Sequence, residues 1–256
     1  MSVELQSDER LDVVNDNLSL IQKKNGHAFG TDALLLAAFV RGRRRGRALE
    51  FGGGGGIVSL LCAGRGKFAH ITCVEVRPEY AALAERNIAL NGLQARVRAV
   101  CADIRELDTY GQEGDYHAVF ANPPYMKTDT GKPNRAAGKN AARHETRGGI
   151  ADFCHAAAKK LRYGGSFFCV WRPDRLADLM RALDAAQLEV KKMTFVCADT
   201  QKPPSMVLVE ARLGGGGGLV LTRNLFLYRA PGERVYSDEM AYILHSGSFP
   251  SEREGV

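Results

Sequence analysis

The sequence contains no run of eighteen apolar residues, so no segment is long enough to cross a membrane as a helix. It has only six cysteines, none of them in a CxxC pair, and most lie in apolar stretches. Such cysteines are typical of buried, reduced thiols and argue against a structural zinc. The polar, acidic stretch 1–16 does not resemble a secretory signal. We therefore expect a cytoplasmic protein with no membrane segment and no metal.

Internal repeats are also absent, and the bulk composition is ordinary. The 256 residues are 45% hydrophobic and 25% charged, which fits one α/β core with small extensions. A formal net charge of +6 fits a nucleic-acid partner without requiring one. The first basic cluster spans residues 41–47 and is explained equally well by a solvated face. The second, at 127–147, directly follows the motif described below, and there we favour a role in substrate binding.

Short apolar strands alternate with amphipathic helices from about residue 47 onward, and this rhythm predicts a mostly parallel sheet covered on both faces. The strands are expected at 47–51, 71–76, 97–101, 118–121 and 165–171, and the helices at 78–89, 150–161 and 173–186. Two further strands, 190–198 and 206–212, have no helix between them and predict an antiparallel hairpin at the sheet edge.

The flanking segments are shorter. In front of the core we expect one helix at 32–40 with Thr31 as its N-cap, and behind it a strand at 219–228 and a short helix at 238–244. The predicted organisation is an N-terminal extension, the core and a C-terminal extension, with bounds 1–46, 47–213 and 214–256.

A glycine run closes the first predicted strand. Glu50 precedes Gly52–Gly56, and residue 57 is Ile, so the G-x-G-x-x-G spacing of dinucleotide sites is not met from Gly52. The spacing instead reads acid-x-G-x-G-x-G, with Gly52, Gly54 and Gly56 as the spaced glycines. This form suits S-adenosylmethionine, whose cationic amino group a nearby carboxylate helps to hold. The alternative is a flexible loop.

Two more acids end the next two strands. Glu75 is placed to accept hydrogen bonds from both ribose hydroxyls of a nucleoside, and Asp103 to accept one from an adenine amino group. Each acid alone would be an ordinary surface or capping residue. Three acids at successive strand ends favour a cofactor site.

The most specific motif is Asn122-Pro123-Pro124-Tyr125, directly after the fourth strand. An adenine amino group or a carboxamide nitrogen is a poor nucleophile because its lone pair is delocalised. The Asn122 side-chain oxygen and the Pro123 carbonyl each accept one N–H bond and aim that lone pair at a methyl group. The prolines stiffen the loop, and Tyr125 offers a flat face for an extruded base.

With these motifs the chain resembles the class I methyltransferases that carry Asn-Pro-Pro-Tyr, and more closely the bacterial tRNA1(Val) adenine-N6 methyltransferase family. The resemblance runs from about residue 10 to 245, and further matching segments lie at 27–36, 142–145, 172–176 and 207–212. It implies a Rossmann-like α/β fold with a seven-stranded, mostly parallel sheet whose last strand is antiparallel. It implies S-adenosylmethionine as cofactor and methyl transfer to N6 of adenine 37 in tRNA1(Val), by a protein we expect to be a monomer.

The resemblance also assigns residues beyond the motifs. Phe29, Thr31 and Asp32 are expected against the methionine end of the cofactor. Arg143 and His144 are candidate tRNA contacts, although a structural role explains His144 equally well. Gly53 and Gly55 depart from the family, which usually carries small or polar residues there. Because extra glycines raise the entropy cost of ordering a loop, we expect weaker cofactor binding than is typical.

Three alternatives remain open. In the first, the same motif serves a methyltransferase that acts on the glutamine side chain of release factors or on DNA adenine. Release-factor enzymes normally carry a helical N-terminal domain, whereas about forty-six residues precede the core here, and DNA enzymes usually carry a large target-recognition region for which we find no room. The short N-terminal segment and the basic stretch 127–147 are the features that discriminate. The second alternative is a non-catalytic RNA-binding protein on a methyltransferase fold. The third is a nucleotide-binding oxidoreductase, for which the glycine spacing is wrong.

Overall fold

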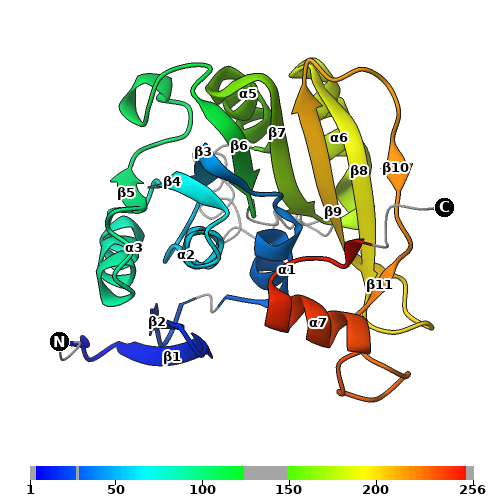
Figure 1. Cartoon of the computed structure of the whole chain (residues 1–256), viewed down its shortest axis with the longest axis horizontal. Coiled ribbons are helices and arrows are strands. Elements are labelled where there is room, and N and C mark those ends of the chain that lie inside the picture. The colour runs from blue at the N-terminus through cyan, green and yellow to red at the C-terminus, as the bar shows by residue number, and fades with distance from the viewer. Residues whose placement is uncertain (1–3, 27–28, 124–148, 252–256) are drawn as a thin grey trace, which may run out of the picture.

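A twisted, mostly parallel sheet forms the centre of the computed structural model, which describes residues 4–26, 29–123 and 149–251 (Figure 1). Its seven long strands are β3 (Arg43–Phe51), β4 (Phe68–Glu75), β5 (Val97–Cys101), β6 (Tyr116–Ala121), β7 (Leu161–Trp171), β8 (Leu188–Cys197) and β9 (Pro204–Leu213). They lie in the order β5-β4-β3-β6-β7-β9-β8. Of these seven strands, β9 alone runs opposite to the others, and it pairs with β7 and β8. This confirms the predicted fold class and the hairpin of β8 and β9.

The sheet extends beyond these seven strands along its outer edge. Two short strands, β10 (Val220–Leu221) and β11 (Leu225–Phe226), pair in parallel with β8. The single strand expected at 219–228 is therefore two pieces, because the chain leaves the edge of β8 between them. At the N-terminal end of the core, the first strand begins at Arg43 rather than at Arg47.

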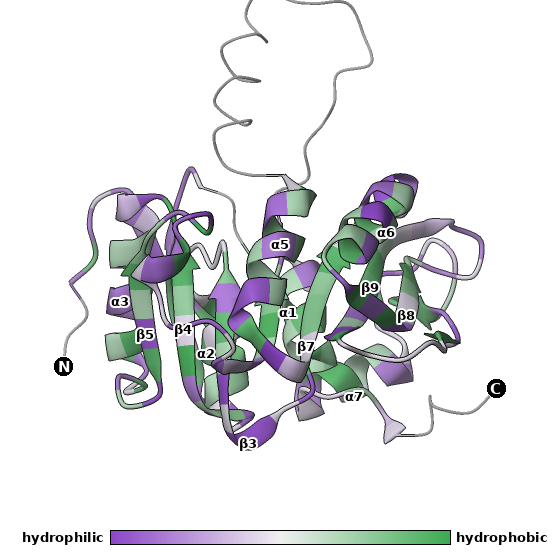
Figure 2. Cartoon of the chain, turned by 90° about the horizontal axis from the view of Figure 1, so that it is seen from above, coloured by the Kyte–Doolittle hydropathy of each residue, from purple (hydrophilic) through white to green (hydrophobic). Residues whose placement is uncertain are grey.

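Helices cover both faces of the sheet. The structure describes α1 (Thr31–Phe39), α2 (Ile57–Gly64), α3 (Pro78–Leu90), α5 (Ile150–Lys160), α6 (Leu176–Ala185) and α7 (Asp238–Ser246), with short 3-10 turns η1 (Leu107–Thr109) and η2 (Pro173–Arg175). Side chains of α1, α2 and α7 pack with Ala48 and Phe168 on one face, while α5 and α6 pack with Leu49 and Phe167 on the other. Successive side chains of a strand point to opposite faces of the sheet, so the neighbours Ala48 and Leu49 enter different layers. The strands are mainly hydrophobic (Figure 2).

The N-terminal segment holds an antiparallel hairpin that we did not predict from the sequence. It consists of β1 (Glu9–Asn15) and β2 (Leu18–Lys23), paired only with each other. The N-terminal extension thus contains a hairpin as well as a helix. In Figure 1 the hairpin lies beside α3, on the side of the molecule away from β8.

Helix α1 begins one residue earlier than the predicted 32–40, and its cap differs. Its N-cap is Gly30, in an extended conformation, and Thr31 is the first helical residue. The expectation that Thr31 caps the helix was wrong because the helix already includes Thr31, and the glycine before it has no side chain that could cap. The Asp32 side chain accepts the Ala33 backbone N–H at 2.9 Å. The same Ala33 N–H also donates to the Gly30 carbonyl at 3.2 Å, so this donor of the first turn is shared between two acceptors.

Candidate functional site

The glycine run forms a tight turn between β3 and α2. Gly52, Gly54 and Gly56 have φ angles of 65°, 54° and 87°, in the left-handed region that favours glycine. These are the three glycines singled out by the acid-x-G-x-G-x-G spacing. Backbone conformation therefore accounts for every second residue of the run.

Gly53 and Gly55 do not have positive φ angles, so their surroundings must be considered instead. A Cβ on Gly53 would overlap the Cys73 sulfur and approach the Glu50 carboxylate, whereas a Cβ on Gly55 would make ordinary contacts, 3.4 Å from Asn87 Nδ2. Gly53 is thus a steric requirement of the cysteine beneath it. Cys73 thus occupies the space that a side chain at position 53 would need.

The turn is also held by hydrogen bonds. The Gly54 N–H donates to Glu75 Oε2 at 2.9 Å, the Gly53 N–H donates to the Val74 carbonyl at 3.1 Å, and Asn87 Nδ2 donates to the Gly55 carbonyl at 2.9 Å. Three separate points of attachment contradict the flexible-loop alternative.

A cavity of about 600 Å³ opens beside this turn. In an open α/β sheet this is where ligands bind, outside the carboxyl ends of the strands. The predicted residues that line it are Phe29, Asp32, Glu50, Gly52, Gly54, Glu75, Asp103, Asn122 and Pro123. Two predicted cofactor residues do not line it: Thr31 is the first residue of α1, and Gly56 is the N-cap of α2. Pro124, Tyr125, Arg143 and His144 lie outside the described residues.

Glu50 lies at the bottom of the cavity and is only 3% exposed. Its Oε2 accepts the backbone N–H of Ser59 at 2.9 Å and the Ser59 hydroxyl. Burial raises the pKa of Glu50 to about 7, against the opposing effect of the Ser59 hydrogen bonds. A cationic group bound nearby would favour the ionised form of this carboxyl.

Glu75 and Asp103 share an arrangement in which the arginine two positions later binds the acid. Arg77 donates to Glu75 Oε1 from its backbone N–H at 3.0 Å and from Nε at 2.8 Å. Arg105 binds both oxygens of Asp103, and these hydrogen bonds hold the pKa of Asp103 below its usual value. Both acids are thus held in place by arginines, Glu75 at the end of β4 and Asp103 just after the end of β5.

Asn122 follows β6 and faces the cavity. Its Nδ2 donates to Asp32 Oδ2 at 2.9 Å, which joins the motif to the start of α1 across ninety positions of sequence. Pro123 beside it is buried. Of the four motif residues, the structure therefore describes the first two, and both border the cavity.

Several lining residues were missed in the sequence. Ile21 and Gln22 come from β2, Arg77 and Tyr80 from the start of α3, and Phe153 from α5. The sequence did contain a signal for the hairpin, because polar and apolar residues alternate from residue 10 to 13 and Asn15-Asp16-Asn17 is typical of a turn. The Arg77 guanidinium lies 3.7 Å from the centre of the Tyr80 ring, a cation–π contact that no local pattern announces.

The first basic cluster is remote from the cavity. Arg43, Arg44 and Arg45 are exposed at the beginning of β3, while the glycine turn follows the end of that strand. Arg41 and Arg47 at the borders of the cluster form ion pairs with Glu210 and Asp115. A strand of this length separates the two ends by about 30 Å. For this cluster the structure favours the solvated face.

Neither a metal cluster nor a membrane-spanning helix is found in the described part of the chain. Between residues 4 and 251, apart from the two gaps, no three His, Cys, Asp or Glu side chains come together as metal ligands. The helices described in those same ranges are all too short or too polar to cross a membrane.

Sequence comparison finds relatives that are named as tRNA methyltransferases. A tRNA1(Val) (adenine(37)-N6)-methyltransferase from Flavobacteriaceae bacterium strain 3519-10 is 32% identical over 45% of this chain and 49% of its own length. The Klebsiella pneumoniae protein of the same name is 29% identical over 70% of this chain and 73% of its own. The chain thus spans about half of the first relative and about three quarters of the second.

Solved structures share the fold. A predicted O-methyltransferase from Agrobacterium tumefaciens has a TM-score of 0.70 at 21% identity, covering 86% of this chain and 98% of that one. M. jannaschii TYW2 in complex with AdoMet has a TM-score of 0.57 at 13% identity, covering 82% and 87%. The methyltransferase small domain family matches residues 24–196, most of the chain. The glycine turn, the paired strand-end acids and this match together establish that the chain belongs to the methyltransferase small domain family.

Proposed function

We propose that this protein transfers the methyl group of S-adenosylmethionine to the N6 amino group of an adenine in tRNA, with adenine 37 of tRNA1(Val) as the target. The observation that carries the proposal is the convergence of Glu50, Glu75, Asp103 and the Asn122-Pro123 peptide on one cavity. The relatives named for this reaction support the choice of tRNA.

The cavity fits this cofactor. Glu75 provides carboxylate oxygens for a ribose, and Asp103 an acceptor for an adenine amino group. Glu50 provides a buried carboxyl near the turn for a cationic amino group. When bound, S-adenosylmethionine supplies an electrophilic methyl group on a sulfonium. Unlike a dinucleotide it is cationic and carries no phosphate, which suits a cavity lined by the four acids Asp32, Glu50, Glu75 and Asp103.

The chain's own part in the reaction is alignment. Asn122 Oδ1 and the Pro123 carbonyl accept the two N–H bonds of the target nitrogen, which directs its lone pair at the methyl carbon. The acceptors also stabilise the positive charge that develops on that nitrogen as the bond forms. We propose that Tyr125 stacks on the extruded base and that Arg143 and His144 contact tRNA. The N6 proton leaves to solvent after transfer.

The same proposal includes the domain organisation, the oligomeric state and the cellular location of the protein. The sheet and its helices at 47–213 carry the cofactor and the motif, and the extensions 1–46 and 214–256 flank them. We propose that the protein acts as a monomer in the cytoplasm, where its tRNA substrate is found. Sedimentation at micromolar concentration tests the monomer: a mass near 28 kDa supports it, and twice that mass contradicts it.

The test is methyl transfer from labelled S-adenosylmethionine to unmodified tRNA, followed by nucleoside analysis. We expect N6-methyladenosine, and we expect Asn122→Ala to lower turnover by roughly 10²- to 10³-fold with cofactor binding nearly intact. Methylation of a glutamine-containing release factor in place of tRNA would support the protein-substrate alternative. Absence of cofactor binding would support the non-catalytic one.

A further inference from the structure

We infer that Asp32 is a positioning residue: it fixes the side-chain amide of Asn122 so that the oxygen, and not the nitrogen, faces the amino group to be methylated. The inference rests on the proposed function and concerns a residue that the family resemblance would place against the cofactor. The hydrogen bond that carries it runs from Asn122 Nδ2 to Asp32 Oδ2 and is 2.9 Å long.

A primary amide has two ends of nearly equal size and opposite hydrogen-bonding character. If Asn122 turned over, it would present two N–H donors to a nitrogen that itself carries N–H donors, and the alignment would be lost. A carboxylate only accepts hydrogen bonds, so Asp32 selects the NH₂ end of the amide. The opposite end, Oδ1, is thereby left for the substrate.

Asp32 is itself fixed from two sides. Its Oδ1 accepts the Ala33 backbone N–H at 2.9 Å, within the first turn of α1. Gly30 leaves room for it, since a Cβ on Gly30 would lie 2.7 Å from Asp32 Oδ1. The φ angle of Gly30 is −109°, which any residue adopts. A side chain at position 30 would therefore displace the Asp32 carboxylate, while the backbone there accepts any residue.

The alternative is that Asp32 binds the positively charged part of the cofactor. The two roles predict different kinetics. Removing a cofactor ligand weakens cofactor binding. Removing a positioning hydrogen bond lowers the rate of methyl transfer from the bound complex, because the nucleophile is misaligned. The direct hydrogen bond from Asn122 Nδ2 to Asp32 Oδ2 is the observation that favours positioning.

The decisive experiment exchanges the two side chains. Asp32→Asn leaves Asn122 facing a group that no longer selects its NH₂ end, and Asn122→Asp places two carboxylates together. Each should lower the single-turnover rate on tRNA by roughly 10²-fold while the cofactor dissociation constant changes less than about threefold. In the double variant, the amide introduced at 32 donates to the carboxylate introduced at 122, whose second oxygen still accepts. We expect it to recover at least about tenfold of the rate that each single variant loses.

Controls separate this inference from the proposed function. Asp184→Asn, an exposed carboxylate on α6, should leave rate and affinity unchanged. Gly30→Ala should reduce the rate as Asp32→Asn does. Weaker cofactor binding with an unchanged single-turnover rate in Asp32→Asn, or no recovery in the double variant, overturns the positioning role.

An activity-independent readout completes the test. The Asn122 side-chain NH₂ signals, assigned by their disappearance in Asn122→Asp, should show slow proton exchange in the native protein and fast exchange in Asp32→Ala. Equal exchange in both contradicts the hydrogen bond even if tRNA proves not to be the substrate. A wild-type protein inactive on tRNA with the protected amide intact rejects the proposed function alone.

Discussion

At the scale of single residues, Glu50 shows how a sequence motif acquires its chemistry from burial. The acid ahead of the glycine turn is recognisable in the sequence, but its pKa of about 7 arises because the folded chain removes it from water. The unfolded carboxyl has a pKa near 4.5. Its contribution to stability is therefore fully present below pH 4.5 and decreases as the pH rises toward 7.

The same shift predicts a pH dependence of cofactor binding. Because a cationic ligand favours the ionised carboxylate, affinity for S-adenosylmethionine should increase as the pH rises through about 7 and then level off. Calorimetric titration at pH 6, 7 and 8 measures this directly. Glu50→Gln should bind more weakly at pH 8 and show a flat profile over this range. A variant that keeps the native slope would show that another group titrates.

Gly53 and Gly55 form a matched pair of substitutions at the turn. Gly53→Ala forces the Cys73 sulfur aside and should reduce the free energy of unfolding by about 1–3 kcal/mol. Gly55→Ala meets only ordinary contacts and should raise it by about 0.4–1 kcal/mol, since alanine restricts the unfolded chain.

Denaturant unfolding of both variants checks this prediction. Adding Cys73→Ala to Gly53→Ala removes the overlapping sulfur and should restore part of the stability. If Gly53→Ala is as stable as the native protein, the turn has more room than its geometry indicates, and the expectation of a loose turn with weak cofactor binding regains support.

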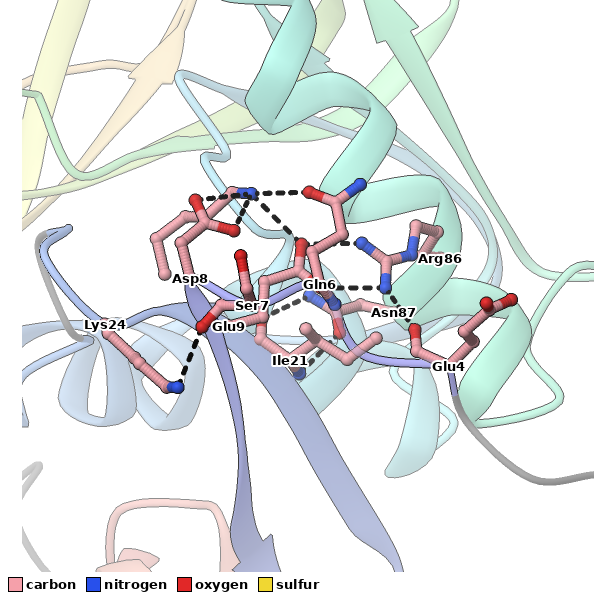
Figure 3. Close-up of polar contacts among 10 residues, drawn as sticks. Glu4, Gln6, Ser7, Asp8, Glu9, Ile21, Lys24, Arg86 and Asn87 are labelled. Carbon is pink, nitrogen blue, oxygen red and sulfur yellow. Dashed lines mark hydrogen bonds and ion pairs between the residues drawn. The ribbon is translucent and has the colours of Figure 1, made fainter.

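At the scale of elements, the β1–β2 hairpin is attached to α3 by side chains that imitate strand pairing (Figure 3). Asn87 accepts the Ile21 N–H at 2.7 Å and donates to the Ile21 carbonyl at 3.1 Å, and Asn91 bonds Ser19 in the same way. The buried Glu9 accepts two hydrogen bonds from Arg86, which lower its pKa to about 2. The stability from Glu9 is therefore present above pH 4.5 and is lost as the pH falls through 2.

Asn87 makes one hydrogen bond toward the cavity that Asn91 does not make, which yields a prediction. It also donates to the Gly55 carbonyl and so joins the hairpin to the cofactor turn. Both Asn87→Ala and Asn91→Ala should destabilise the protein by about 1–3 kcal/mol, because each leaves backbone groups unpaired. Only Asn87→Ala should also weaken cofactor binding. Calorimetry on the two variants separates these effects, and equally weakened binding in both would assign the effect to the hairpin as a whole.

At the scale of the whole molecule, the sheet decides which charges lie near the substrate. Since β3 runs between them, the exposed arginines at its beginning are at the opposite end from the cavity. The second basic cluster directly follows the motif in sequence, although residues 124–148 are not among those the structure describes.

This arrangement predicts how tRNA binding depends on salt. Affinity should fall steeply with rising salt because basic side chains displace counterions from phosphates. Arg44→Gln with Arg45→Gln should leave the slope of log affinity against log salt unchanged. Lys139→Gln with Arg143→Gln should reduce it by about 1 for each phosphate that is no longer neutralised. Filter binding at several salt concentrations distinguishes the pairs, and a reduced slope in the first pair would place tRNA on the far end of the sheet.

The sequence by itself determined the features that depend on local rules. Strand and helix alternation predicts the doubly wound sheet because each element's periodicity reflects which side is buried. Gly52, Gly54 and Gly56 are recognisable because left-handed backbone excludes most other residues. The acids Glu50 and Glu75 are recognisable because parallel strands bring their carboxyl ends to one edge.

Tertiary structure alone decided the rest, because those features arise between residues far apart in the chain. The Asp32–Asn122 hydrogen bond joins a helix start to a strand end, and Cys73 fills the space that a side chain at Gly53 would need. The hairpin's place against α3 depends on Asn87, a polar residue that looks like any helix surface position in the sequence. Local pattern reports which face is buried, but the partner of a buried polar group is fixed only by packing.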